Sequence, residues 1–382
     1  VNIKMKNKYV GFRGMLYGNG FQRDNDWSPV GGTMGGYANG KFKLLATAIY
    51  RYAYRSLRDR SYYDYFLEDR QITNIDKGSD HGNEVRGSLN LTYEPTSRAT
   101  MGIAASIIAV NKVSSMNTFT TTVLHGEETP SSSYIHSDSP MGRPRIGLVA
   151  FYDLQTDDNG SMLKVKADYG NGSTLTKYDR LFGTYQEYER RYSSDEGYSA
   201  KADYSHRFKG GTQAQAGASG YHGNMRRNSL INGVTEDERY SDWRARAFMQ
   251  VSHSFGFGLY ASAGVEVNYA KMSVNGVNNF GYDFTYVNPS AALMYSFPKG
   301  NHILTLSYES SSTEPSYRML NPYKTWTSDN SYEEGNPDLK PYKVHHLNLN
   351  YRFLNAFSIS VNHNIYNDQL SLVTNSTDDG IT

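Results

Sequence analysis

Apolar and polar residues alternate along several segments of the chain, with the period of two that is typical of a β-strand with one apolar face. Segment 347–353 separates them cleanly, with Leu347, Leu349, Tyr351 and Phe353 on one face and Asn348, Asn350 and Arg352 on the other. Segments 85–92, 163–169, 243–252 and 357–362 alternate in the same way, with Phe248 as the one exception. Because the polar faces carry charged residues, we expect a water-filled or plugged space beside them instead of a dry core.

Short turns separate the strands. They lie at 38–41, 94–97, 156–160, 209–211, 255–258, 298–301 and 354–356. Several contain Asn-Gly or consecutive glycines, which supply the positive φ of tight hairpins. Successive turns are roughly 43 to 62 residues apart, enough for two strands of about 9 to 12 residues and one longer polar loop. The chain therefore predicts about fifteen strands in the order short turn, strand, long loop, strand.

Aromatic residues lie beside every short turn, as in the pairs Tyr37 and Phe42, or Tyr295 and Phe297. Tyrosine is abundant, with 33 of 382 residues. Rings at one level are typical of the interface between membrane and water. The predicted fold is all-β, an antiparallel up-and-down transmembrane β-barrel. Its alternating strands are consistent with the low mean hydropathy of −0.65.

Composition excludes several other classes. The longest uncharged apolar run, 100–110, is shorter than the roughly 20 residues of a membrane-spanning helix. The chain has no Cys, which removes thiolate chemistry, disulfides and Cys-based zinc sites. With 39 basic and 38 acidic residues and no long basic run, binding to nucleic acid has no electrostatic support. We find no nucleophile motif and predict that the protein is not an enzyme.

Two motifs carry a resemblance to a known family. Residues 335–341 read Gly-Asn-Pro-Asp-Leu-Lys-Pro directly before an alternating strand, and residues 314–322 end in Leu-Asn-Pro. With these motifs the chain resembles the TonB-dependent outer-membrane receptor superfamily, particularly its outer-membrane β-barrel family. Tyr342 stands where the family often has Glu, and Glu314 stands where it usually has Arg.

The resemblance implies a barrel of 22 strands closed by a plug domain. Residues 1–7 look like the end of that plug and residues 8–382 like a partial barrel that lacks the last strands. It also implies that the protein lies in the bacterial outer membrane among its lipids, contacts the TonB complex through the plug, and imports an unknown nutrient ligand. It implies no cofactor.

Two patterns suggest metal sites, but both have simpler explanations. His345 and His346 are neighbours in a predicted strand, so they point to opposite faces and do not share one ion. Residues 157–160 have the composition of a calcium loop, but they lack the remaining oxygen ligands and the terminal Glu. We expect a structural role for the histidines, a turn at 157–160, and no metal site.

Ligand contacts are expected from outer loops and from the polar faces. Candidates in the loops are aromatic residues able to stack on a ligand: Tyr62, Tyr63, Tyr65, Tyr317, Tyr323 and Trp326. The alternative is that these rings pack loops together or form the outer girdle. Candidates on the polar faces are Arg51, Arg244 and Arg246.

Three hypotheses follow for the whole protein. The first is a TonB-dependent importer of a nutrient. The second is a surface-binding or structural outer-membrane barrel that transports nothing. The third is a soluble all-β protein.

Overall fold

The structure is a computed structural model that describes residues 10–382, except 24–25, 66–68, 141–143, 183, 277–278, 299, 324, 329–330, 355, 372–375, 378–379 and 382. For residues 23, 182, 317, 325–328, 331–333, 376–377 and 380–381 only the backbone is described. The predicted end of a plug domain, residues 1–7, lies outside the described residues.

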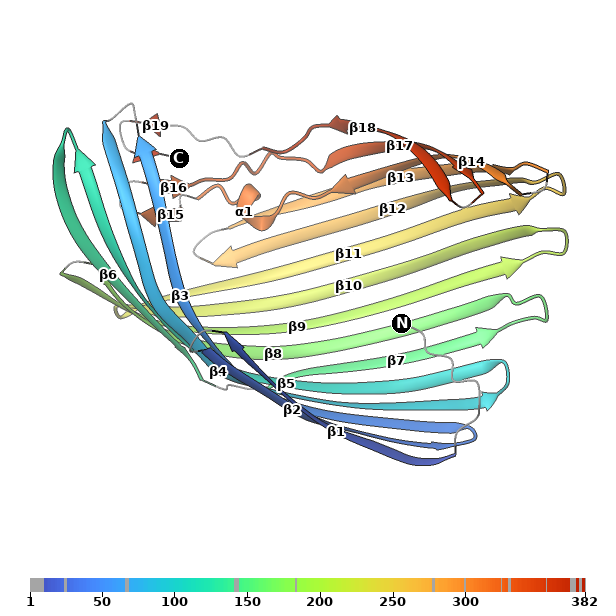
Figure 1. The fold of residues 1–382 in the computed structure, drawn as a ribbon, viewed down its shortest axis with the longest axis horizontal. Coiled ribbons are helices and arrows are strands. Elements are labelled where there is room, and N and C mark those ends of the chain that lie inside the picture. The colour runs from blue at the N-terminus through green and yellow to red at the C-terminus, as the bar shows by residue number, and fades with distance from the viewer. Residues whose placement is uncertain are drawn as a thin grey trace. The chain divides into compact units, whose positions relative to one another are not determined.

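Sixteen strands form one sheet within the described residues (Figure 1). They are β1 (Gly11–Arg23), β2 (Asp26–Asn39), β3 (Phe42–Tyr65), β4 (Arg70–Thr96), β5 (Ala99–Leu124), β6 (Glu127–Ser139), β7 (Arg145–Gln155), β8 (Met162–Phe182), β9 (Tyr185–Arg207), β10 (Thr212–Ile231), β11 (Val234–Ser254), β12 (Leu259–Gly276), β13 (Phe280–Ser296), β14 (His302–Thr313), β17 (Tyr342–Phe353) and β18 (Phe357–Asn367). Apart from β6 and β7, each strand pairs with the next strand of this sheet along the chain, and the pairs are antiparallel wherever a register is defined. The predicted all-β, antiparallel up-and-down fold is therefore confirmed.

The strands β6 and β7 occupy one position in the sheet. The hydrogen-bonded order runs β5, β6, β8, and β7 also pairs with both β5 and β8. The first of the two strands ends at Ser139 and the second begins at Arg145. Among the described residues the sixteen strands therefore fill fifteen positions, which agrees with the predicted count of about fifteen.

The chain divides into two compact units. The first contains residues 1–150, 168–197 and 224–239, and the second contains 151–167, 198–223 and 240–382. The division cuts across β7 to β11, because each of these strands contributes one end to each unit.

In the first unit the strands β3, β4 and β5 have 24, 27 and 26 residues. This is more than twice the roughly 9 to 11 residues that cross a bilayer. The register of β3 and β4 continues unbroken from Phe42↔Tyr93 to Tyr65↔Arg70. The sequence predicted a long polar loop between the turns at 38–41 and 94–97, and this prediction was wrong. The polar residues satisfy one another across the strands, as in the hydrogen bond from Thr118 Oγ1 to Asp76 Oδ1 at 2.6 Å, so the pairing continues.

The predicted short turns each join two strands of the sheet, although the turn expected at 94–97 lies two residues later, between Thr96 and Ala99. Gly258, in the second unit, shows why one of them needs glycine. Its φ is +91°, and a Cβ there would lie 2.4 Å from the Ser296 carbonyl oxygen. Its neighbour Gly256 has open space around it.

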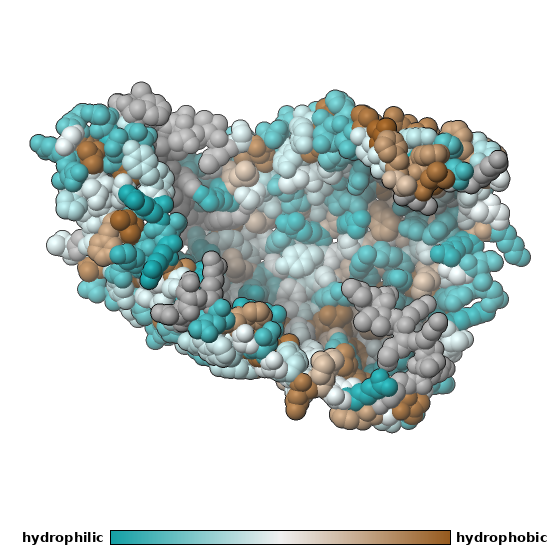
Figure 2. Space-filling view, viewed as in Figure 1, coloured by the Kyte–Doolittle hydropathy of each residue, from teal (hydrophilic) through white to brown (hydrophobic). Residues whose placement is uncertain are grey.

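Few apolar side chains are buried. Among the described residues the buried hydrophobic ones are Ala99, Ala270, Val274, Leu320 and Val344, whereas most large apolar side chains are exposed. Figure 2 shows apolar residues gathered over β17 and β18, where Leu347, Leu349, Ile359 and Val361 are exposed. The apolar side chains of these strands therefore face outward and do not fill a dry core. Within the described residues, no helix has the length and apolarity needed to cross a membrane.

Short elements follow β14. Helix α1 (Tyr317–Leu320) has four residues. The strands β15 (Thr325–Ser328), β16 (Ser331–Glu333), β19 (Ser376–Thr377) and β20 (Gly380–Ile381) form a second small sheet. Within this small sheet, Ser376 pairs with Ile381 and Thr377 pairs with Gly380.

Candidate ligand-facing wall

Strand β11 carries two predicted ligand-binding residues, Arg244 and Arg246, on its polar face. The alternate residues on the opposite face are apolar and include the exposed Trp243, Met249 and Val251. The exception to the alternation, Phe248, lies on the polar face, where the Arg246 guanidinium carbon is 5.1 Å from its ring centroid. A Cβ at Gly217 of β10 would lie 2.5 Å from Phe248 Cε1, so the glycine makes room for this ring. The cation–π contact accounts for an aromatic residue at a polar position.

Arg244 joins two carboxylates. Its Nε lies 3.1 Å from Asp242 Oδ2, and its Nη1 lies 3.3 Å from Glu314 Oε2. The hydroxyl of Tyr286, on β13, donates to Glu314 Oε1 at 2.9 Å. Glu314 follows β14 directly, so this contact connects a loop to the face of the sheet formed by β11 and β13. The side chain of Glu314 is 12% exposed, against 49% for Arg244.

Arg246 makes a second contact one step along the same face. Its Nε donates to Glu266 Oε2 at 2.6 Å, and Asn268 Nδ2 donates to Glu266 Oε1 at 2.8 Å. We define the wall of the second unit as Arg244, Arg246, Glu266, Tyr286 and Glu314. This wall therefore alternates positively and negatively charged side chains. Its groups are paired to one another but remain partly exposed, so they are available to a polar ligand.

The two motifs that suggested the family contact each other. The Gly335 N–H donates to the Asn321 carbonyl at 2.7 Å, and the Asn336 N–H donates to the Met319 carbonyl at 2.7 Å. A Cβ at Gly335 would lie 2.5 Å from the Met319 carbonyl oxygen. We call residues 314–321 with 335–336 the clasp. As the sequence predicted, a strand begins just after residues 335–341. Its first residue, Tyr342, pairs with Thr313.

The structure locates the predicted arginines on polar faces in both units. Arg51 lies on β3 opposite Glu84 in the first unit. Arg244 and Arg246 lie on β11 in the second unit. That these three arginines bind a ligand remains a prediction.

The predicted aromatic cluster at Tyr62, Tyr63 and Tyr65 is divided between two faces. All three lie in β3 and not in a loop, and successive strand residues alternate in direction, so Tyr62 faces away from the other two. Tyr62 is 57% exposed. The Arg70 guanidinium carbon lies 4.5 Å from the Tyr65 ring centroid. The prediction that they share one loop was wrong, because the strand continues through them.

The remaining aromatic candidates follow β14. Tyr323 is exposed, and its N–H donates to Asn321 Oδ1 at 3.2 Å, next to the clasp. Tyr317 begins α1, and Trp326 pairs with Tyr332 between β15 and β16. The side chains of Tyr317 and Trp326 lie outside the described part of the structure.

The two histidines have separate partners. His345 Nδ1 lies 2.8 Å from the Tyr308 hydroxyl, and His346 Nδ1 lies 2.9 Å from Asn364 Oδ1. Among the described residues no group of three or more His, Cys, Asp or Glu could hold a metal ion.

The segment with the composition of a calcium loop forms a turn. Asp157 accepts hydrogen bonds from the Ser161 N–H at 2.9 Å and the Ser161 hydroxyl at 2.6 Å. The fully buried Ser161 Oγ also accepts from the Arg207 N–H at 3.0 Å. The bonds from Ser161 hold the pKa of the Asp157 carboxyl below its ordinary value. The predicted turn at 157–160 is therefore present in the structure.

Sequence reasoning did not identify Glu266, Tyr286 or Glu314 as members of the wall. Glu314 gave a signal, since it departs from the family motif where Arg is usual. Glu266 lies at a polar position of an alternating strand. Their pairing with arginines across the sheet depends on the register, which the sequence alone did not define.

The chain is similar to known outer-membrane proteins. The profile of the outer membrane protein beta-barrel family matches residues 154–382. The structure of the RagAB peptide transporter is similar over 89% of this chain, with a TM-score of 0.51 and 13% identity. This chain spans 44% of the length of that transporter chain. The beta domain of the Bordetella autotransporter BrkA matches with a TM-score of 0.27 and 12% identity, over 81% of this chain and 99% of that one. No curated protein matches the chain by sequence.

Proposed function

Because the chain belongs to the outer membrane protein β-barrel family, we propose that it is the barrel wall of a TonB-dependent receptor that imports a nutrient ligand. The protein lies in the bacterial outer membrane. That location does not agree with the hypothesis of a soluble all-β protein. The outer-membrane location explains the two different faces of each strand, because lipid contacts the apolar face and water contacts the polar one.

The observation that carries the proposal is the pairing of Arg244 with Glu314. A loop that follows β14 is tied by an ion pair to the water-facing side of β11. A polar ligand that enters along this face competes for the same guanidinium and carboxylate groups. Ligand entry and the position of the clasp are then linked through one contact.

The gate and the energy source come from outside this wall. We propose that a plug domain fills the lumen and that the TonB complex pulls on it, as the resemblance of residues 314–322 and 335–341 to TonB-dependent receptors implies. The alternating charges of the wall suit a ligand that carries both a positive and a negative group. A short peptide has an amine and a carboxylate, and a structurally similar protein is a peptide transporter. Short peptides are therefore the first ligands to test.

The test is uptake of labelled short peptides by cells that produce the full-length protein, with and without an active TonB complex. We expect uptake that requires TonB and falls when Arg244→Met and Glu314→Gln are combined. The exposed Arg58→Gln, on β3 of the other unit, is the control. Uptake that is equal without TonB contradicts the proposal, and so does a lack of import of any peptide.

A specific observation also favours the second hypothesis, a barrel that binds at the surface and transports nothing. The strands β3 to β5 extend far beyond the length that a bilayer needs. Projecting strands of this kind present a large surface to a partner. In the same experiment this alternative predicts peptide or partner binding that is independent of TonB, without entry into the cell.

A further inference from the structure

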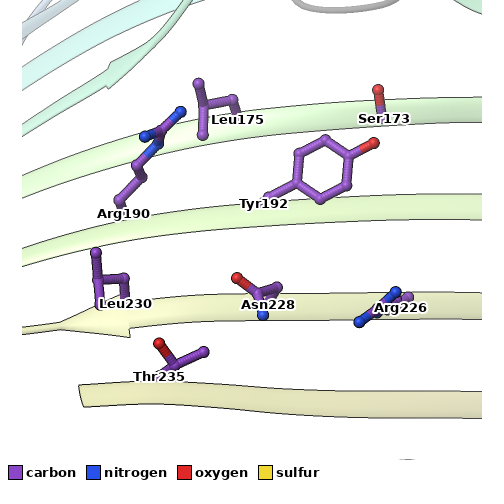
Figure 3. A pocket seen from close by; sticks show the side chains of 8 residues that line it. All are labelled: Ser173, Leu175, Arg190, Tyr192, Arg226, Asn228, Leu230 and Thr235. Atoms are coloured by element: carbon purple, nitrogen blue, oxygen red, sulfur yellow. The ribbon is translucent and has the colours of Figure 1, made fainter. Parts of the chain in front are cut away.

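A cavity of about 610 Å³ lies on the first unit, where β8, β9, β10 and β11 run side by side (Figure 3). Its lining residues are Ser173, Leu175, Arg190, Tyr192, Arg226, Asn228, Leu230 and Thr235. The side chains of Arg190 and Tyr192 extend from β9 toward Leu175 and Ser173 on β8 (Figure 3). The volume falls in the range of small-molecule sites.

The cavity opens on the lipid side of the sheet and not on the wall described above. On β8, Ser173 and Leu175 continue in steps of two the apolar series that ends at Tyr169. The Tyr169 hydroxyl donates to Glu196 Oε1 at 3.1 Å, so Glu196 of β9 shares this face. Tyr192 and Arg190 lie four and six residues before Glu196 along β9, so their side chains share its face. A ligand of this cavity therefore approaches from the membrane side.

The cavity also lies at a defined level. Tyr169 ends the apolar series of β8, and its ring with a wet hydroxyl is typical of the membrane interface. Ser173 and Leu175 are four and six residues further along the strand. With a rise of about 3.3 Å per residue and a tilt of about 40°, they lie roughly 10 and 15 Å beyond the interface. These positions lie beyond the phospholipid headgroup layer of about 5 to 8 Å, at the level of sugars attached to outer-leaflet lipids.

Charge at the cavity is positive. Arg190 makes no hydrogen bond or ion pair with any described residue. Arg226 forms a two-pronged ion pair with Asp237, with Nε–Oδ1 3.0 Å and Nη2–Oδ2 2.9 Å. Arg239 lies 3.8 Å from the same carboxylate. Arg226 and Arg239 thus share one carboxylate and, within the described part of the chain, Arg190 has none, which leaves excess positive charge for an anion.

The remaining lining groups complete a site for a phosphorylated sugar. Guanidinium groups bind phosphate through paired hydrogen bonds. The Tyr192 hydroxyl, the Asn228 amide and the Thr235 hydroxyl offer donors and acceptors to sugar hydroxyls. Leu175 and Leu230 give the apolar contact that a sugar ring or the base of an acyl chain needs.

We propose that this cavity binds the phosphorylated saccharide headgroup of an outer-leaflet lipopolysaccharide. The proposal depends on the outer-membrane location and on the cavity, and not on transport. It assigns Arg190 as the principal phosphate contact, because its charge is not already neutralised by a carboxylate. The other lining residues orient the sugar.

The test uses the full-length protein, stripped of bound lipid and reconstituted in nanodiscs of zwitterionic phospholipid. Short-chain lipopolysaccharide with intact phosphates is the probe, and the same material after enzymatic dephosphorylation is its comparison. We expect Arg190→Gln to weaken binding of the phosphorylated probe roughly tenfold, as expected for the loss of one charged contact. Dephosphorylation weakens binding to the wild type by a similar factor and has little effect on the Arg190→Gln variant.

The matched control is Arg58→Gln, which removes an exposed arginine from β3 in the same unit but outside the cavity. It leaves binding unchanged. Circular dichroism and heat-modified gel mobility establish that both variants are folded. Equal binding by Arg190→Gln and wild type overturns the proposal, and so does equal binding of the dephosphorylated probe. Detached core oligosaccharide that binds as tightly as the intact lipid also overturns it, since the ligand is then not a membrane lipid.

Discussion

The guanidinium of Arg244 lies 3.3 Å from the carboxylate of Glu314, although 70 positions of the sequence separate the two residues. Arg244 is on β11, and Glu314 begins the clasp that follows β14. Tyr286 holds the second oxygen of the same carboxylate. One charged group of a loop is thereby fixed to the water-facing side of the sheet.

Removal of this contact tests its strength. We expect a double-mutant cycle with Arg244→Met and Glu314→Gln to give a coupling free energy of about 0.5 to 1 kcal/mol, since Arg244 is half exposed and water screens part of the attraction. The measurement is denaturant unfolding of the full-length protein in detergent. The cycle of Arg244→Met with Asp76→Asn is the control, because Asp76 bonds to Thr118, whereas Arg244 pairs with Asp242 and Glu314. A coupling near zero for the first cycle means that the ion pair does not hold the loop.

The clasp makes a separate prediction. Gly335→Ala introduces a Cβ at 2.5 Å from the Met319 carbonyl oxygen, so the two clasp segments must move apart. Limited proteolysis of the folded protein is expected to cut the Gly335→Ala variant within residues 314–341 much faster than the wild type. Gly18→Ala on β1, where a Cβ meets no atom within 4 Å, serves as the comparison. If both variants are cut at the wild-type rate, the clasp does not depend on this close approach.

The turn between β11 and β12 offers a matched pair of glycines. Gly258→Ala combines a φ of +91° with a Cβ 2.4 Å from the Ser296 carbonyl oxygen, whereas Gly256→Ala meets no atom within 4 Å. We expect Gly258→Ala to lower the free energy of unfolding by about 1 to 3 kcal/mol and Gly256→Ala to change it by less than about 1 kcal/mol. Thermal or denaturant unfolding measures both. Equal effects of the two substitutions contradict the role assigned to this backbone geometry.

The turn at Asp157 predicts a pH dependence. Because the folded state lowers the pKa of Asp157, ionised Asp157 stabilises the fold above the ordinary pKa of an aspartate. That stability is lost as the pH falls through the lower pKa of the folded state. We therefore expect Asp157→Asn to reduce the difference in thermal stability between neutral pH and about pH 3. Asp158→Asn keeps both bonds to Ser161 and is the control, so an identical pH profile of wild type and Asp157→Asn argues against the prediction.

The repeated parts of this fold were predictable from the sequence. Glycine-rich turns such as 255–258 and the alternation along 347–353 report local backbone and side-chain requirements, which nearby residues determine. The start of a strand just after Pro341 was likewise evident from the motif. These features define the fold class and approximate the number of strands.

The long strands and the paired charges were not predictable in the same way. Tyr62, Tyr63 and Tyr65 lie among polar residues that were interpreted as a loop, but cross-strand pairs keep them in β3. The contact between Arg244 and Glu314 depends on the register of β11 to β14, and a shift of one residue would turn either side chain to the other face. Local sequence does not define that register, so the wall was only partly identified.

The central claim is that lipid contacts one face of each strand and water contacts the other. The chain has no Cys, so single cysteines can be introduced and labelled in the full-length protein in outer membranes with a maleimide that does not cross lipid. On β11 we expect Arg246→Cys and Gln250→Cys to react, and Ala245→Cys and Ala247→Cys to be protected until detergent is added. Equal labelling at all four positions, or protection of the set that includes Arg246, would contradict this account.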